Sequence, residues 1–135
     1  MTGVSFPLHA AFFAALGGDE QLAETIGNRI FDTPPRDAEF PYVTLGDWSA
    51  ADWSTGTETG TEHRLTVHAW SRAGGKAESW SIVDAIREAL HDRDFTLDGQ
   101  ALVNLRFERA AVNLDSDRRT WHGVARFRAV TEPVA

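Results

Sequence analysis

The stretch RLTVHAWSR-AGGK-AESWSIVDAIREALH, residues 64–91, contains in succession a strand pattern, a turn and a helix pattern. In its first part, apolar side chains recur at every second residue, at Leu65, Val67 and Ala69. A period of two predicts a strand with one buried face. The other face of this strand would carry Arg64, Thr66, His68 and Trp70.

The adjacent glycines Gly74-Gly75 predict a turn after this strand. From residue 77 to residue 91 the apolar period becomes helical, and the predicted buried stripe is Ser79, Ile82, Val83, Ile86, Ala89 and Leu90. Burying each large aliphatic side chain of that stripe contributes about 1.5–3 kcal/mol, more than the intrinsic propensity of one short helix. We therefore expect this strand and helix to form the core on which the rest of the chain packs.

Two short helices are predicted before the central strand. Residues 6–16 form the first, with Ser5 as its cap and Gly17-Gly18 at its end, and its expected apolar stripe is Leu8, Phe12, Phe13 and Leu16. Asp19 is placed to cap a second helix that ends near residue 25. A brief extended segment at residues 29–32 and a strand that starts at Pro41 follow.

Two further strands are predicted after the central helix. Residues 100–110 alternate, with Ala101, Val103, Leu105 and Phe107 expected to face inward. After a turn at residues 115–118, residues 120–130 alternate again, with Trp121, Ala125, Phe127 and Ala129 inward. The predicted fold class is α+β, a mostly antiparallel β-sheet with α-helices packed on one face, in a single domain over residues 1–135.

Residues 47–61 form the segment least typical of regular structure. The segment is rich in Gly, Ser and Thr, and we interpret it as a long β-hairpin loop. It carries Trp48 and Trp53, whose large apolar rings need a surface to cover them. Either the two rings fold back on their own sheet, or they bury against another subunit.

The composition excludes several classes of function. The chain of 135 residues has no cysteine, which removes disulfides, thiolate catalysis and zinc–thiolate sites. A net charge of −7 argues against a general nucleic-acid binder, whereas it suits a surface that DNA must pass without sticking. No apolar run is long enough to span a membrane, and the N-terminus lacks the basic start of a secretory signal, so we expect a cytoplasmic protein.

The residues offer no catalytic or metal-binding pattern. The five histidines, at positions 9, 63, 68, 91 and 122, show no HExxH or HxH spacing. The sequence also lacks GxSxG, P-loop and GxGxxG motifs. We therefore predict that the protein is not an enzyme and that it has no cofactor, catalytic residue or metal site.

Arginines on the outward sheet face are the remaining candidates for function. This set comprises Arg64, Arg106, Arg126 and Arg128. In one reading they form a solvated face with Glu62 and Glu108 as partners, because exposed ion pairs are common and weak. In the other reading they join Trp70, Trp48 and Trp53 in a subunit interface, where arginine and aromatic residues are enriched.

An ordered set of short motifs adds a family resemblance. The motifs are Ile30-Phe31-Asp32 before Pro34-Pro35, Pro41-Tyr42-Val43 with Gly46, Trp70-Ser71-Arg72, Ala89-Leu90-His91-Asp92, Leu97-Asp98-Gly99, and His122-Gly123 leading into Arg126-Phe127-Arg128. Together they resemble the tail-completion or tail-terminator proteins of long, flexible-tailed bacteriophages, prophages and gene transfer agents. The resemblance runs from residue 8 to residue 132, and residues 47–61 match it least.

The resemblance implies helices packed on a sheet and assembly of six copies into a ring. Such a ring would cap the tail tube at its head-proximal end, stop its polymerisation and present a surface to a head or neck connector protein. DNA would pass through the lumen without specific binding, and the subunits would assemble in the bacterial cytoplasm. Two other readings stay open: a head-completion protein on the portal side, and an unrelated enzyme or small-molecule-binding domain.

Overall fold

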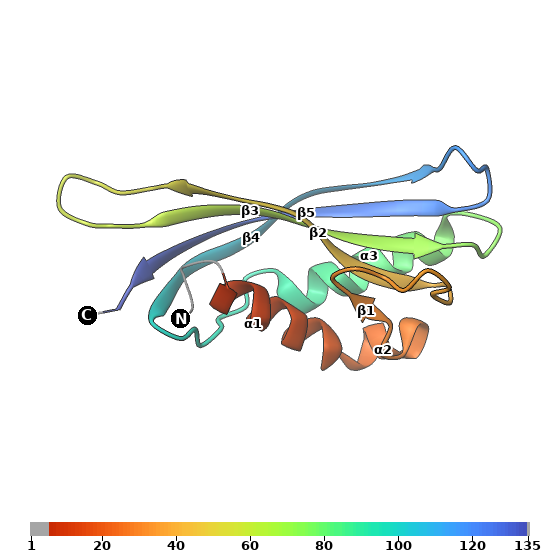
Figure 1. The fold of residues 1–135 in the computed structure, drawn as a ribbon, viewed down its shortest axis with the longest axis horizontal. Coiled ribbons are helices and arrows are strands. Elements are labelled where there is room, and N and C mark those ends of the chain that lie inside the picture. Colours follow the sequence, from red (N-terminus) through yellow and green to blue (C-terminus); the bar gives the residue numbers. More distant parts are fainter. Residues whose placement is uncertain (1–5, 135) are drawn as a thin grey trace.

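The computed structural model describes residues 6–134 and has the predicted α+β architecture, a five-stranded sheet with three helices on one face (Figure 1). Ser5, the predicted cap of the first helix, lies outside the described residues. The elements in chain order are α1 (Phe6–Gly17), α2 (Glu20–Ile26), β1 (Ile30–Phe31), β2 (Tyr42–Asp52), β3 (Thr61–Ser71), α3 (Ala77–Leu90), β4 (Gln100–Leu114) and β5 (Trp121–Pro133).

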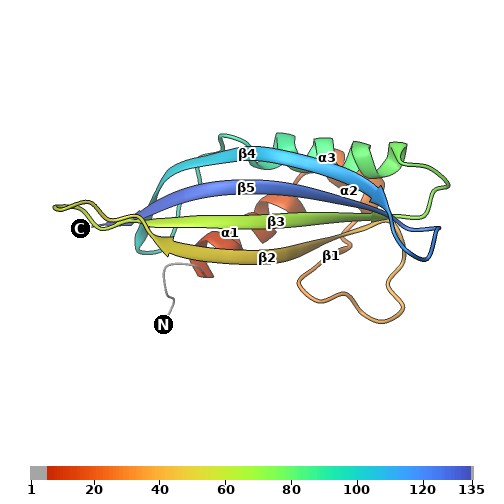
Figure 2. The ribbon, with the colours of Figure 1, turned by 90° about the horizontal axis from the view of Figure 1, so that it is seen from above.

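The sheet is mostly antiparallel, and its strand order is β1-β2-β3-β5-β4 (Figure 2). The pairs β2–β3, β3–β5 and β5–β4 are antiparallel, whereas the two-residue β1 pairs with β2 in parallel. The central strand predicted from the sequence, β3, therefore lies in the middle of the sheet. It pairs with β5 over its whole length without a bulge, from Thr61↔Thr131 to Ser71↔Trp121.

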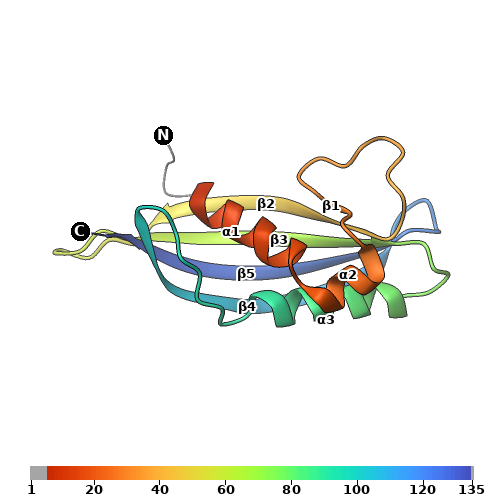
Figure 3. The same ribbon diagram turned by 90° about the horizontal axis from the view of Figure 1, so that it is seen from below.

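The hydrophobic core lies between the sheet and the helices, which all cover the same face (Figure 3). Every member of the predicted stripe of α3 is buried, and so are Leu65, Val67 and Ala69 on the facing side of β3. Helix α1 adds Leu8, Phe12 and Leu16 to this core. The prediction was wrong for Phe13, which is 40% exposed on the outer side of α1.

Local contacts fix the positions of two helices. Asp19 is the N-cap of α2, as predicted, and its Oδ2 accepts the backbone N–H of Leu22 at 2.9 Å. Helix α3 approaches β5 closely at Gly123, where a Cβ would lie 2.8 Å from Ser79 Oγ and from Val83 Cγ2. A glycine is therefore needed here for close helix–sheet packing.

The predicted alternation along β4 was wrong at its N-terminal end. Val103 is 51% exposed and Ala101 is exposed, whereas Leu102 packs against the core. The reason is a β-bulge between Leu102 and Asn104, which inserts one extra residue and reverses the faces before it. A second bulge lies between Phe107 and Arg109.

The segment predicted as a long loop, residues 47–61, is strand at residues 47–52 and again at Thr61. Strand β2 runs on to Asp52 and pairs with Thr61 of β3, so only residues 53–60 connect the two strands. Within the connection, the backbone N–H of Trp53 donates to Gly60 O at 2.9 Å and that of Thr55 to Glu58 O at 2.8 Å. We call residues 52–61 the hairpin arm; it projects beyond the rest of the molecule (Figure 1).

Candidate functional site: the open face of the sheet

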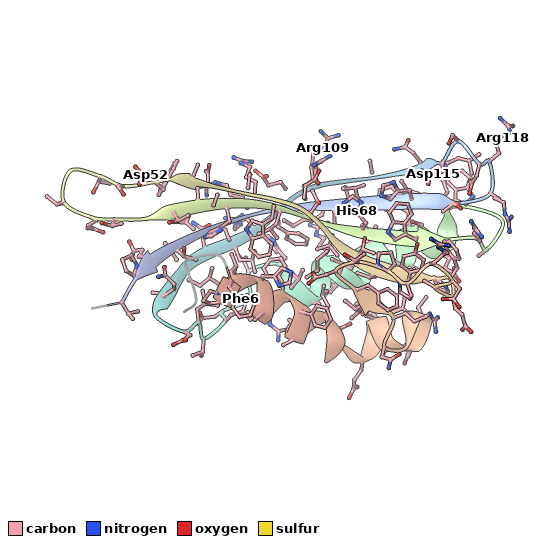
Figure 4. The ribbon with its side chains drawn as sticks, viewed as in Figure 1. Phe6, Asp52, His68, Arg109, Asp115 and Arg118 are labelled. Carbon is pink, nitrogen blue, oxygen red and sulfur yellow. The ribbon has the colours of Figure 1, made fainter. Side chains whose placement is uncertain are left out.

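The sheet face opposite the helices carries no covering layer among residues 6–134, and we call it the open face (Figures 1 and 4). It presents side chains from β2, β3, β5 and β4. Two groups of residues occupy it: a row of stacked rings, and a group of arginines near the middle of the sheet. None of the three helices in the described part of the chain is long and apolar enough to cross a membrane.

Four rings stack across neighbouring strands of the open face. Tyr42 and Trp70 lie opposite each other on β2 and β3, with ring centroids 6.2 Å apart. Trp70 stacks in turn on His122 of β5 at 3.8 Å, with an angle of 8° between the ring planes. His68 stacks on His122 at 4.8 Å. Cross-strand ring pairs of this kind stabilise a sheet, so the row holds three strands together.

A hydrogen bond joins the two imidazoles of this row. Nδ1 of His68 and Nε2 of His122 are 2.6 Å apart, and His68 Nε2 lies 3.1 Å from Thr66 Oγ1. Burial lowers the pKa of both histidines; for His68, the charges of His122 and Arg126 lower it further, against an opposing effect of Asp47. Neutral rings are therefore favoured at neutral pH, so that one ring can donate to the other.

Gly46 makes room for the His68 ring. A Cβ at position 46 would lie 2.6 Å from Thr66 Oγ1 and even closer to His68 Nε2. Gly46 and Asp47 lie in a bulge of β2, between the pairs Leu45↔Val67 and Trp48↔Leu65. The glycine therefore allows the imidazole to lie over the β2 backbone.

Replacing Gly46 with alanine is expected to destabilise the fold by about 1–3 kcal/mol, because the His68 ring must leave its stacked position. Guanidinium denaturation followed by circular dichroism measures this loss. The matched control is Gly56→Ala at the tip of the arm, where no atom lies within 4 Å of the added Cβ. If the ring is the cause, Gly46→Ala should cost much less in a His68→Ala background; an equal cost in both backgrounds would refute this explanation.

Three of the four predicted arginines lie on the open face, and two of these three, Arg64 and Arg128, form ion pairs. Arg64 Nη1 makes a bidentate contact with Glu108 at 2.6 and 2.7 Å, and Arg128 Nε lies 2.7 Å from Glu62 Oε2. Arg126 has no such partner in the part of the chain that the structure describes. The fourth arginine, Arg106, lies on the edge strand β4, and its Nε is 3.7 Å from Asp92 Oδ1.

Arg126 instead faces a second arginine that the sequence analysis did not select. Arg109 of β4 is directly opposite Arg126 of β5. Among residues 6–134, no carboxylate oxygen lies within 4.0 Å of a guanidinium nitrogen of either residue. Like charges directly opposite on neighbouring strands destabilise the pairing. An anion bound between Arg109 and Arg126 would therefore stabilise this part of the sheet.

Trp48 and Trp53, the two tryptophans of residues 47–61 that were predicted at the interface, lie in different places. The bulge at Gly46-Asp47 turns Trp48 to the helix side, where its ring lies 6.0 Å from that of Phe12 in α1. Its Nε1 donates to Nδ1 of the fully buried His63 at 3.3 Å. Trp48 therefore folds back on its own chain. Trp53 lies on the hairpin arm, 53% exposed, with the Arg128 guanidinium 4.9 Å from its ring centroid.

His63 is a residue that the sequence did not single out. Its Nε2 lies 3.0 Å from Thr131 Oγ1, so the ring links β3 to β5 as well as to Trp48. Burial lowers its pKa, which favours the neutral ring that can accept the Trp48 N–H. These contacts fix the root of the hairpin arm. The signal in the sequence was a histidine at an inward position of the strand pattern.

Titratable groups elsewhere have structural explanations. Asp117, in the turn after β4, accepts hydrogen bonds from the Thr120 hydroxyl and from the backbone N–H groups of Arg119 and Thr120. These bonds, with the nearby Arg72, lower the pKa of its carboxyl to about 2. Within residues 6–134, no three histidine, aspartate or glutamate side chains converge into a metal-binding group.

Comparison with known proteins adds independent findings. A family model described as "Tail completion protein gp17" matches residues 10–132. The tail completion protein gp17 of Bacillus phage SPP1 is 30% identical to the chain over 103 residues, which cover 75% of each protein.

Two solved structures share the fold. A chain from the virion of a native gene transfer agent particle aligns with a TM-score of 0.90 and 29% identity, over 98% of this chain and 99% of that chain. The structure of the bacteriophage SPP1 gp17 protein aligns with a TM-score of 0.64 and 26% identity, over 97% and 91% of the two chains.

Proposed function

The chain belongs to the tail completion protein gp17 family, a structural component of phage and gene transfer agent particles, and from this premise we propose that six copies form a ring that terminates the tail tube and joins it to the head. The observation that carries the proposal is the match, over nearly the whole length of both chains, to a subunit of an assembled particle. The partners are further copies of this chain, the tail tube protein and a head or neck connector protein.

The two faces of the molecule support a ring. The open face carries arginines and stacked rings, whereas the opposite face consists of helices. A contact between two different patches of the same chain is heterologous, and it closes into a ring if the rotation between copies is right. We infer that Trp53, Trp70 and the arginines Arg64, Arg106, Arg126 and Arg128 lie near the contacts between copies. Trp48 supports that contact indirectly, through its bond to His63.

A ring of this kind stops a tube by geometry. Tube subunits add to a growing end because that end repeats the same interface, and a ring of matched symmetry occupies it. The other side of the ring then offers a different surface to the head. DNA passes through the lumen without specific binding, which an overall charge of −7 favours. Assembly in the bacterial cytoplasm would precede incorporation into the tail.

A head-completion protein on the portal side is the alternative, because such a protein would also form a ring between head and tail. A major tail protein gene immediately downstream would favour the terminator. Asp117, the acid whose pKa is lowered to about 2, lies in an exposed turn outside the arginine group, where its hydrogen bonds explain the shift.

Locating the subunit in the particle tests the proposal. A small epitope inserted at Gly74, in the exposed turn between β3 and α3, should bind antibody at the junction between head and tail tube. Negative-stain electron microscopy of purified particles records the position, and quantitative mass spectrometry against the tube protein records the copy number. Label along the tail or at its distal end, or a single copy per particle, would contradict the proposal.

A further inference from the structure

The middle of the open face is hollowed where the unpaired arginines lie. The hollow has a volume of about 550 Å³, and its lining includes Asp47, Arg64, Thr66, Glu108, Arg109 and Arg126. Figure 4 shows Arg109 pointing away from the helices. We call this feature the arginine hollow. Its positive charges exceed its negative ones, in a protein whose net charge is −7.

Arg109 and Arg126 are the two charges of the hollow that an anion would neutralise. Arg64 is already satisfied by Glu108, at 2.6 Å. Arg109 and Arg126, by contrast, face each other across β4 and β5 with no carboxylate within 4.0 Å among residues 6–134. A carboxylate brought in from outside could accept hydrogen bonds from both guanidinium groups. It would also relieve the repulsion between them.

The hairpin arm carries the complementary chemistry. Residues 52–61 contain Asp52 and Glu58 and no lysine or arginine. Both carboxylates are on exposed residues, and the Ser54 hydroxyl donates to Asp52 at 2.6 Å. The remaining residues are mostly threonine and glycine, and the exposed Trp53 supplies a ring on which a guanidinium can stack.

The arm of a given copy extends away from that copy's own hollow. Asp52 lies on the projecting arm, whereas Arg109 lies over the middle of the sheet (Figure 4). The arm is held straight by its strand pairing, Asp52↔Thr61, and by the Trp53–Gly60 hydrogen bond. It is therefore a preformed projection of the kind that reaches a neighbouring molecule.

We propose that the hairpin arm of one copy lies in the arginine hollow of the next copy, with Glu58 or Asp52 between Arg109 and Arg126. This inference rests on the proposed ring and names the contact that builds it. The contact is heterologous, because arm and hollow are different parts of the chain, so it repeats from copy to copy around a ring. Charge complementarity of this kind fixes the register and disfavours wrong partners.

Thiol cross-linking tests the contact, and the absence of native cysteine gives a clean background. The test variant combines Thr57→Cys, next to Glu58 on the arm, with Ser49→Cys in the lining of the hollow, so that all the charges of the contact remain. The control combines Thr57→Cys with Glu88→Cys, which lies exposed on α3, on the helix side of the molecule. Purified particles carrying each variant are treated with a short bifunctional maleimide and run on a denaturing gel. We expect dimers and higher multiples for the test pair and almost none for the control pair.

A charge exchange provides the second test. The hollow variant Arg109→Glu with Arg126→Glu, and the arm variant Asp52→Arg with Glu58→Arg, should each lower the yield of tailed particles by at least about tenfold, since juxtaposed like charges cost several kcal/mol. Combining both variants in one chain should restore the yield. Circular dichroism confirms that each variant folds.

The outcomes separate this inference from the ring itself. Several copies per particle without cross-links in the test pair, or equal cross-linking in both pairs, would overturn the arm contact while leaving the ring in place. Failure of the combined charge exchange to restore the yield would count against the arm contact in the same way. A single copy per particle would overturn both proposals.

Discussion

Replacing Ile86 with aspartate is expected to leave the protein without a cooperatively folded state. Ile86 is fully buried in the middle of α3, within the stripe that packs on the sheet. An unpaired charge at such a position costs several kcal/mol, a large share of the roughly 5–15 kcal/mol that stabilises a typical domain. Thermal unfolding followed by far-UV circular dichroism, together with the soluble yield, measures the effect.

The control for this substitution is Ser81→Asp, which introduces the same carboxylate at an exposed position of the same helix. Ser81→Asp should unfold within a few degrees of the unsubstituted protein, because it changes helix propensity but not burial. An Ile86→Asp protein with a cooperative transition near that of the unsubstituted chain would mean that this face of α3 is not the core.

Helix α3 and strand β3 could be predicted because the apolar pattern of each lies within its own short stretch of sequence. Leu65, Val67 and Ala69 recur with the period of a strand, and the α3 stripe recurs with that of a helix. Each pattern needs only its own residues to be read. The capping of α2 by Asp19 is equally local, since the side chain bonds to the backbone three residues on.

Bulges and uncovered strands escaped prediction because they depend on other strands. One extra residue near Val103 reversed the faces of β4, and only the pairing with β5 reveals it. The bulge at Gly46-Asp47 likewise turned Trp48 toward the helices. Residues 49–52 resemble a loop in sequence because all four are exposed, so they lack the alternation on which a strand prediction depends.

The open face shows the same division between local and long-range information. Strand alternation alone placed Arg64, Trp70, Arg126 and Arg128 on it. The register between β3, β5 and β4 stacks Trp70 on His122 and places Arg109 opposite Arg126. This register cannot be read from a short stretch of sequence. Gly46 makes room for the His68 ring, whose position also depends on register.

Deleting the gene is the experiment with the largest expected effect on particles. If the ring occupies the end of the tail tube, its loss leaves that end open, and tube subunits continue to add. The head then has no surface to bind. We therefore expect filled heads without attached tails, together with tubes of uncontrolled length, and a loss of infection or gene transfer to near the limit of detection.

Negative-stain imaging of particles from the deletion strain measures both effects, and the distribution of tube lengths is the sharper readout. A head-completion protein would leave detached tails of normal length, because the stop on the tube would still be present. The control is the same strain supplied with the gene in trans, which should restore joined particles. The Arg109→Glu with Arg126→Glu variant, supplied in the same way, should fail to restore them if those arginines hold neighbouring copies together. Tails of normal length joined normally to heads in the deletion strain would contradict the terminator role, because nothing but the ring is proposed to stop the tube.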